Sequence, residues 1–118
     1  MKQGPDEKKT PAVNVSDRDF VHEVLAFPTP VLLFLWAPWC AYCRMLHPII
    51  DRIALEYEDR LKVARLNVDE NPAACSQYGI QGVPTMIIFK DGKAASRMVG
   101  VLSKEDIERR LQTLFSVD

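Results

Sequence analysis

The sequence predicts an α/β protein with a central mixed β-sheet flanked by helices on both faces. Apolar runs of strand length alternate along the chain with stretches of helical periodicity, as in strand–helix–strand units. Near the end of the chain two strand-like segments, 85–89 and 94–99, are joined by Asp91-Gly92, a dipeptide that favours a tight hairpin turn. A hairpin adds antiparallel strands to an otherwise parallel sheet, so the sheet should be mixed.

The first elements follow from capping residues and apolar runs. Residues 12–15 predict a short strand. Ser16, with Asp19 three positions later, gives the capping-box pattern that begins a helix, and this helix should end before Pro28. Residues 31–36 are continuously apolar, which is typical of a strand buried on both faces.

The later elements complete the order β-α-β-α-β-α-β-β-α. A helix over 44–57 has apolar residues at helical spacing and contains Pro48, which should kink it. Residues 61–68 alternate as a strand, and Asn71-Pro72 opens a short helix. After the hairpin, Ser103 caps a final amphipathic helix.

The composition is that of a soluble globular protein. The chain has 118 residues, of which 47% are hydrophobic and 26% charged, and a chain of this length buries about two thirds of its unfolded surface. The formal net charge of −1 gives no support to a nucleic-acid partner. Residues 1–11 are polar and charged, so we expect a flexible segment there and a single domain over 12–118.

Cysteine usage and hydropathy bear on the compartment. The chain has three cysteines, an odd number that argues against a secreted disulfide scaffold. No signal-peptide pattern is visible, and the longest apolar stretch, 31–39, is too short to span a membrane. We therefore expect a cytoplasmic monomer with no membrane partner.

The segment most informative about function is Trp39-Cys40-Ala41-Tyr42-Cys43, between the apolar strand and the following helix. Two cysteines three residues apart at a helix start lie on one face, close enough to close a disulfide ring. Cys40 is placed where free backbone N–H groups and the helix dipole stabilise a thiolate, and Cys43 lies one turn further in. This arrangement supports reversible dithiol–disulfide exchange. The alternative is a pair of buried cysteines that act only as small hydrophobic residues.

Further motifs occur along the chain in a fixed order, and they are Trp36-Ala37-Pro38-Trp39 before Cys40, Pro48, Val68-Asp69-Glu70-Asn71-Pro72, Tyr78-Gly79-Ile80, Gly82-Val83-Pro84-Thr85, Phe89-Lys90-Asp91-Gly92 and Val99-Gly100. In this order and spacing the chain resembles the thioredoxin family from about Val13 onward. The resemblance implies the thioredoxin fold and a protein-disulfide reductase. It also implies that Cys40 is the exposed attacking thiol and Cys43 the buried resolving thiol.

The resemblance further implies a substrate-docking surface beside the cysteines. Pro84 occupies the place of the family's cis-proline loop, whose backbone groups bind an extended substrate segment. The alternative is an ordinary proline at the start of a strand. The apolar part of the surface is expected to consist of Trp39, Ile80, Val83 and Gly100, with Trp36 packed beneath Trp39.

Two departures from the family pattern affect the site. Thioredoxins commonly have a buried Asp six residues before the first cysteine, where this chain has Phe34, so we expect Arg65 to lack its customary partner. Phe34 cannot accept a proton, and we expect Cys43 to lose its proton through water or to the departing substrate thiolate. The alternative is that Phe34 only improves core packing.

The second departure is Ala41-Tyr42, where the family commonly has Gly-Pro. Neither residue carries a charge, so a strongly oxidising potential is not expected, although a shift of some tens of millivolts is. Tyr42 is also expected to change which partners dock.

Three other residues are candidates of lower specificity. Cys75 is predicted to be an idle thiol, or else a regulatory one. His47 is predicted to be a surface or capping group rather than a base, and His22 a solvated group. A metal site formed by Cys40, Cys43 and His47 would lack an obvious fourth ligand.

Three functions remain open at this point. The first is a disulfide reductase that acts on protein substrates and is recycled by a thioredoxin reductase or another thiol donor. The second is a non-catalytic interaction module, and the third is a more oxidising or isomerase-like exchange protein. No Gly-rich phosphate loop or dinucleotide-binding fingerprint is present, so no cofactor is expected.

Overall fold

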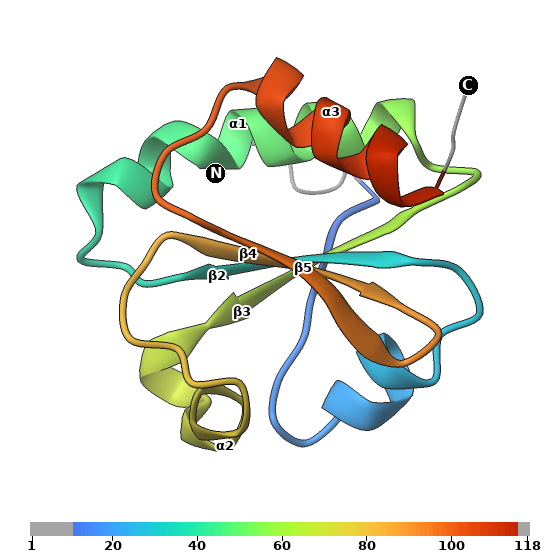
Figure 1. The fold of residues 1–118 in the computed structure, drawn as a ribbon. Coiled ribbons are helices and arrows are strands. Elements are labelled where there is room, and N and C mark those ends of the chain that lie inside the picture. Colours follow the sequence, from blue (N-terminus) through green and yellow to red (C-terminus); the bar gives the residue numbers. More distant parts are fainter. Residues whose placement is uncertain (1–10, 116–118) are drawn as a thin grey trace.

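The computed structural model describes residues 11–115 and confirms the α/β architecture, with a five-stranded mixed sheet in the order β1-β3-β2-β4-β5 (Figure 1). The strands are β1 (Val13–Asn14), β2 (Val31–Trp36), β3 (Lys62–Asn67), β4 (Thr85–Lys90) and β5 (Lys93–Val99). The helices are α1 (Ala41–Glu56), α2 (Pro72–Gln77) and α3 (Lys104–Phe115), with short helical turns η2 (Val21–Leu25) and η3 (Val68–Glu70). The predicted flexible segment 1–11 lies, apart from Pro11, outside the described residues.

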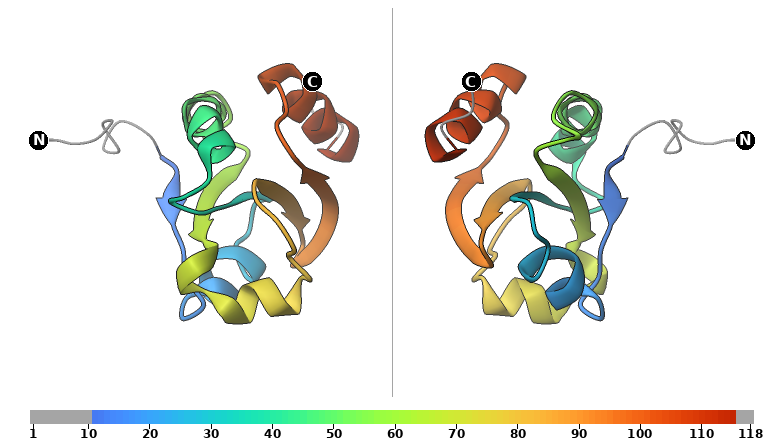
Figure 2. Two further views of the ribbon diagram at one scale, coloured as in Figure 1. Left: turned by 90° about the vertical axis from the view of Figure 1, so that its left-hand side faces the viewer. Right: turned by 90° about the vertical axis from the view of Figure 1, so that its right-hand side faces the viewer.

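The helices form one layer on each face of the sheet. α1 and α3 cover one face, and α2 and η2 cover the other, as the views of Figures 1 and 2 agree. β2 is the central strand, and alternate residues of its wholly buried part enter two separate cores. Leu32 and Phe34 pack under α1 and α3, together with both cysteines of the Cys40–Cys43 motif. Leu33 and Leu35 pack toward η2 and α2. The continuous apolar run therefore marks a strand covered on both sides, as predicted.

The strand register brings distant residues to the carboxyl end of β2. β3 runs parallel to β2 and sets Arg65 opposite Phe34. β4 runs antiparallel to β2 and pairs Thr85 with Leu35, so that Pro84, just before β4, arrives where the chain leaves β2 for Cys40. The terminal hairpin is confirmed, and both of its turn residues have positive φ, 54° at Asp91 and 80° at Gly92, as a two-residue turn of this type requires.

The first predicted helix is wrong in its extent. The Ser16–Asp19 box is present, because the Ser16 backbone N–H donates to Asp19 Oδ1 at 2.7 Å, but helical structure begins only at η2. The intervening Asp17 accepts hydrogen bonds from the backbone N–H groups of Ala73 and Ala74, both at 2.9 Å. This segment caps α2 instead of extending a helix of its own.

Candidate active site

The two cysteines of the motif lie at the start of α1. Cys40 is the N-cap residue, and its Sγ accepts a hydrogen bond from the backbone N–H of Cys43 at 3.1 Å. The two Cα atoms are 5.3 Å apart and the sulfurs are joined as a disulfide. The sulfur of Cys40 therefore takes the place of an N-cap oxygen, where unpaired N–H groups and the helix dipole stabilise negative charge.

Access to the two sulfurs differs in the predicted direction. Cys43 is 0% exposed and Cys40 5%, so Cys40 is the more accessible, although it is much less exposed than we predicted. When the two cysteines are joined as a disulfide, both belong to the core cluster under α1. Only Cys40 is accessible to the sulfur of another molecule.

Trp39 stands at the surface beside Cys40. It is 67% exposed, and its Nε1 donates to Asp69 Oδ1 in η3 at 3.1 Å. This hydrogen bond holds the large ring on the side of Cys40 that faces η3. Asp69 was not singled out from the sequence, although it lies within a motif that carries the family resemblance.

The Val83–Pro84 peptide bond is cis, as the resemblance implied. The backbone N–H of Gly100 donates to the carbonyl of Pro84 at 3.0 Å, and Val83 packs against the core cluster that contains the cysteines. Ile80 differs, since it is partly buried against the core on the opposite face of the sheet. Two further apolar side chains flank Gly100 and are exposed, and sequence reasoning missed them: Val99 and Val101.

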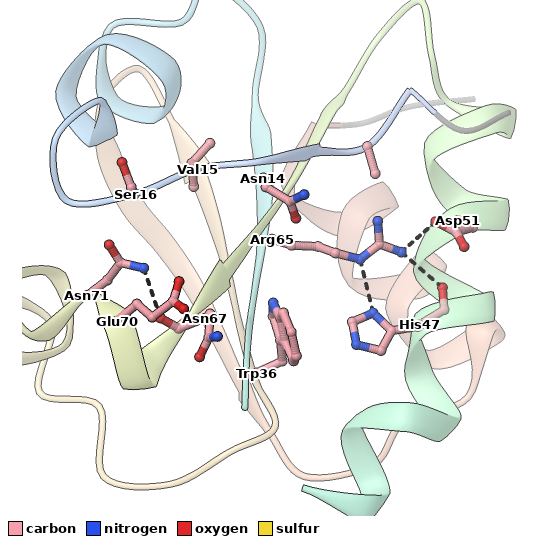
Figure 3. A pocket seen from close by; sticks show the side chains of 11 residues that line it. Asn14, Val15, Ser16, Trp36, His47, Asp51, Arg65, Asn67, Glu70 and Asn71 are labelled. Atoms are coloured by element: carbon pink, nitrogen blue, oxygen red, sulfur yellow. Dashed lines mark hydrogen bonds and ion pairs between the residues drawn. The ribbon is translucent and has the colours of Figure 1, made fainter. Parts of the chain in front are cut away.

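Arg65 lacks its customary acidic partner because position 34 is Phe, but it has another acidic partner that the sequence did not indicate. Its Nη2 lies 2.5 Å from Asp51 Oδ1, on α1, and its Nε donates to His47 Nδ1 at 3.0 Å (Figure 3). The position six residues before Cys40 holds Phe34, which is fully buried. The positive charge of Arg65 is therefore balanced by Asp51 of α1, and not by an acidic residue of β2.

His47 is not a surface group, which was one of the two roles that we predicted for it. It is partly buried, and the rings of Phe34 and Trp36 each meet it edge to face at a centroid distance of 5.1 Å. Burial, together with the charge of Arg65, lowers the pKa of His47, and Asp51 opposes the shift. Because Nδ1 accepts from Arg65, the neutral imidazole carries its proton on Nε2. This leaves no free nitrogen lone pair for proton abstraction. The exposed side chain of His22, in contrast, is as predicted.

A pocket of about 650 Å³ lies between α1 and the loop ends of β1 and β3. Arg65, His47, Asp51 and Trp36 line it, and the ring nitrogen of Trp36 points into it (Figure 3). Within residues 11–115 that nitrogen has no hydrogen-bond partner, and no group of three or more His, Cys, Asp or Glu is arranged to hold a metal ion. The Arg65 hydrogen bond to His47 Nδ1 also competes with any metal at that nitrogen.

Cys75 lies apart from this site. Burial raises the pKa of its thiol, and the charges of Asp17 and Asp69 raise it further. A thiol with a raised pKa forms little thiolate near neutrality. The structure therefore favours the idle thiol over the regulatory one.

Nearly the whole described chain matches a known family. The thioredoxin family model covers residues 11–113. The chain is 47% identical to thioredoxin 1 of Synechococcus elongatus over 100 residues, which is 85% of this chain and 94% of that protein. The chain belongs to the thioredoxin family.

Other relatives extend this match. Thioredoxin of Acidithiobacillus ferridurans is 50% identical over 93 residues, covering 79% of this chain and 86% of that protein. Thioredoxin M4, chloroplastic, of Arabidopsis thaliana is 40% identical over 99 residues, covering 84% of this chain and 51% of that one. Family membership and the paired Cys40 and Cys43 support a dithiol–disulfide oxidoreductase activity of the protein-disulfide reductase type for this chain. Among the described residues, no helix is both long and apolar enough to cross a bilayer.

Proposed function

We propose that Cys40 is the attacking thiol and Cys43 the resolving thiol of this oxidoreductase. The observation that carries the proposal is the position of Cys40 Sγ, which accepts the Cys43 N–H at the N-cap of α1. In the reduced protein the Cys40 thiolate attacks one sulfur of a substrate disulfide, the substrate S–S bond breaks, and one substrate thiolate leaves. The Cys43 thiolate then attacks Cys40 Sγ. The second substrate sulfur leaves as a thiolate. The substrate disulfide has then been reduced by two electrons, and the Cys40–Cys43 dithiol has been oxidised to a disulfide.

The substrates are proteins that contain a disulfide, and the electrons come from a thioredoxin reductase or another thiol donor in the cytoplasm. The Val83–Pro84 loop comes just before β4, beside the end of β2 that leads to Cys40, and this position supports a role for the loop in docking an extended substrate segment. The apolar part of this docking surface consists of Trp39, Val83, Gly100 and, from the opposite core, Ile80. The protein acts as a monomer and needs no cofactor.

The resolving step has no carboxylate at position 34. Phe34 cannot accept a proton, and the only lone pair of neutral His47 is engaged by Arg65. The proton of Cys43 therefore passes to water or to the departing substrate thiolate. Resolution should be slower near neutral pH than with a buried carboxylate, and should accelerate more steeply as the pH rises. Ala41, Tyr42 and Trp36, together with Arg65, set the environment in which this step occurs.

The test is the reduction potential of the Cys40–Cys43 pair, followed by the fluorescence of Trp36 and Trp39 during equilibration with graded thiol–disulfide buffers. A value around −270 mV supports the reductase direction, and a value near −200 mV supports exchange or isomerisation. The absence of any two-electron transition would refute the proposal.

A further inference from the structure

The pocket of about 650 Å³ beside Arg65 is separate from the disulfide, because neither cysteine lines it. It lies at the carboxyl ends of three parallel strands: the last residues of β1, β2 and β3, which are Asn14, Trp36 and Asn67, all line it (Figure 3). In open α/β sheets, ligands bind in crevices outside the carboxyl ends of the strands. The volume also falls within the range of small-molecule sites, about 300–1,000 Å³. Position and volume together favour a small-molecule site.

The wall formed by β2 carries a hydrogen-bond donor without an acceptor. Nε1 of Trp36 is buried and points into the pocket, and no residue within 11–115 accepts from it. Buried N–H groups are nearly always paired, because an unpaired one is costly. Trp39 is the contrast in the same chain, since its Nε1 donates to Asp69 Oδ1 at 3.1 Å. An acceptor oxygen of a ligand in the pocket would satisfy the Trp36 N–H.

Two further donors belong to the same lining. Nε and Nη2 of Arg65 contact His47 and Asp51, and Nη1 takes part in none of these contacts. Oδ1 of Asn67 accepts from the backbone N–H of Asp69 at 3.0 Å, which leaves the Nδ2 donor of its side-chain amide. The lining near Trp36 therefore offers N–H groups, and the ligand group that fits them is an oxygen.

The charges of the lining select an uncharged ligand. Among the described residues that line the pocket, Arg65 is the one permanent cation, and Asp51 already balances it. Burial, together with Arg65, lowers the pKa of His47, so its ring adds no positive charge near neutrality. Glu70, at the end of the pocket away from Asp51, is exposed and adds a negative charge (Figure 3). A carboxylate ligand would therefore meet an excess of negative charge, whereas an amide carbonyl would not.

From these observations we infer that the pocket binds a small uncharged molecule that carries an aromatic ring and an amide group. The amide oxygen accepts from Nε1 of Trp36. The rings of Trp36 and His47, which meet edge to face at a centroid distance of 5.1 Å, provide aromatic surface against which the ring of the ligand packs. This second site does not depend on the roles proposed for the two cysteines.

The experiment titrates benzamide into the full-length ¹⁵N-labelled protein with the Cys40–Cys43 disulfide intact. Two-dimensional NMR resolves the indole N–H signals of Trp36 and Trp39, and the signal that Trp36→Phe removes identifies Trp36. We expect a saturable shift of the Trp36 indole and Asn67 backbone signals, with a dissociation constant of about 1–10 mM for so small a ligand. The indole signal of Trp39 should stay in place. Benzoate, which has the same shape and a negative charge, should bind at least about fivefold more weakly, and so should N-acetylglycinamide, which has amides but no ring.

Three variants test the donor and the charge. Trp36→Phe keeps a ring but lacks the N–H, so benzamide should no longer shift the Asn67 signal. Glu70→Gln removes the negative charge and should bring benzoate to within about twofold of benzamide. Glu105→Gln is the matched control, because Glu105 is also exposed but lies on α3 and does not line the pocket; the preference for benzamide should be unchanged.

The wild-type titration alone can overturn the inference, whether or not each variant folds. It is overturned if the Trp36 indole signal does not shift, or if the Trp39 signal shifts equally. Binding of benzoate as tight as that of benzamide would refute the selection by charge. Equally tight binding of N-acetylglycinamide would show that the pocket takes a peptide amide and would refute the aromatic ligand.

Discussion

Substitution of Asp51 by Asn tests whether the Asp51–Arg65–His47 network replaces a buried carboxylate in balancing charge. The side chain of Arg65 is 10% exposed and that of Asp51 27%, so this pair lies between an exposed and a buried ion pair. Loss of one partner costs up to about 1 kcal/mol at the surface and about 3–5 kcal/mol in a fully buried pair. Asn keeps an acceptor oxygen, and Arg65 keeps its bond to His47. We therefore expect Asp51→Asn to lower the free energy of unfolding by about 1–2 kcal/mol.

The assay is urea unfolding at pH 7 with the Cys40–Cys43 disulfide kept intact in every variant, so that the covalent state does not differ. Glu56→Gln is the matched control. Glu56 is also an acidic residue of α1 in an ion pair, but its side chain is 50% exposed, and its loss should cost less than about 0.5 kcal/mol. The interpretation is refuted if the two variants have equal stability, or if Asp51→Asn unfolds at the wild-type urea concentration.

Three further predictions concern pH and the order of thiol reactions. The pKa of His47 is lowered from its ordinary 6.5, so the folded state favours the neutral imidazole. The stability that His47 contributes is therefore present above pH 6.5 and is lost as the pH falls below 6.5. His47→Gln should therefore flatten the fall in unfolding free energy between pH 7 and pH 5, and a fall as steep as that of the wild-type protein would contradict the structure. Cys43→Ser should accumulate a mixed disulfide with substrate, which mass spectrometry detects, and Cys40→Ser should form none; the reverse result would exchange the two roles. In the wild-type protein, single-turnover resolution should accelerate steeply with pH, and Phe34→Leu should retain that profile, since neither side chain accepts a proton. A wild-type profile that matches a thioredoxin with the buried Asp would exclude the proposed path for the Cys43 proton.

Much of the fold could be predicted from local sequence because local signals agree with the tertiary structure. The apolar run 31–36 coincides with β2, which both helical layers cover. Asp91-Gly92 predicts the hairpin because its backbone requires positive φ. The Ser16 pattern did not predict the extent of the helix for a tertiary reason: the carboxylate of the neighbouring Asp17 accepts from N–H groups of α2 that are 56 and 57 residues away. A capping signal does not reveal which helix is capped.

The pairing of the two cysteines followed from their spacing and the cis Val83–Pro84 bond from the family resemblance, but the network around Arg65 could not be predicted. Asp51 and His47 stand four residues apart, so helical spacing places them on one side of α1. Which strand that side meets depends on how α1 packs over the sheet. No local sequence pattern indicates the register between β2 and β3, which sets Arg65 opposite Phe34.

The two sides of α1 meet different partners, which explains how the chain accommodates Phe34. On the side facing β3, Asp51 balances the charge of Arg65 from the helix, so the central strand needs no acidic residue beneath the cysteines. On the side facing α3, Glu56 forms an ion pair with Lys104 at 2.7 Å. Because the two ion pairs share no residue, Asp51→Asn and Glu56→Gln should have additive effects on the free energy of unfolding. A double variant whose loss of stability differs from the sum by more than about 0.5 kcal/mol would show that the two sides are coupled.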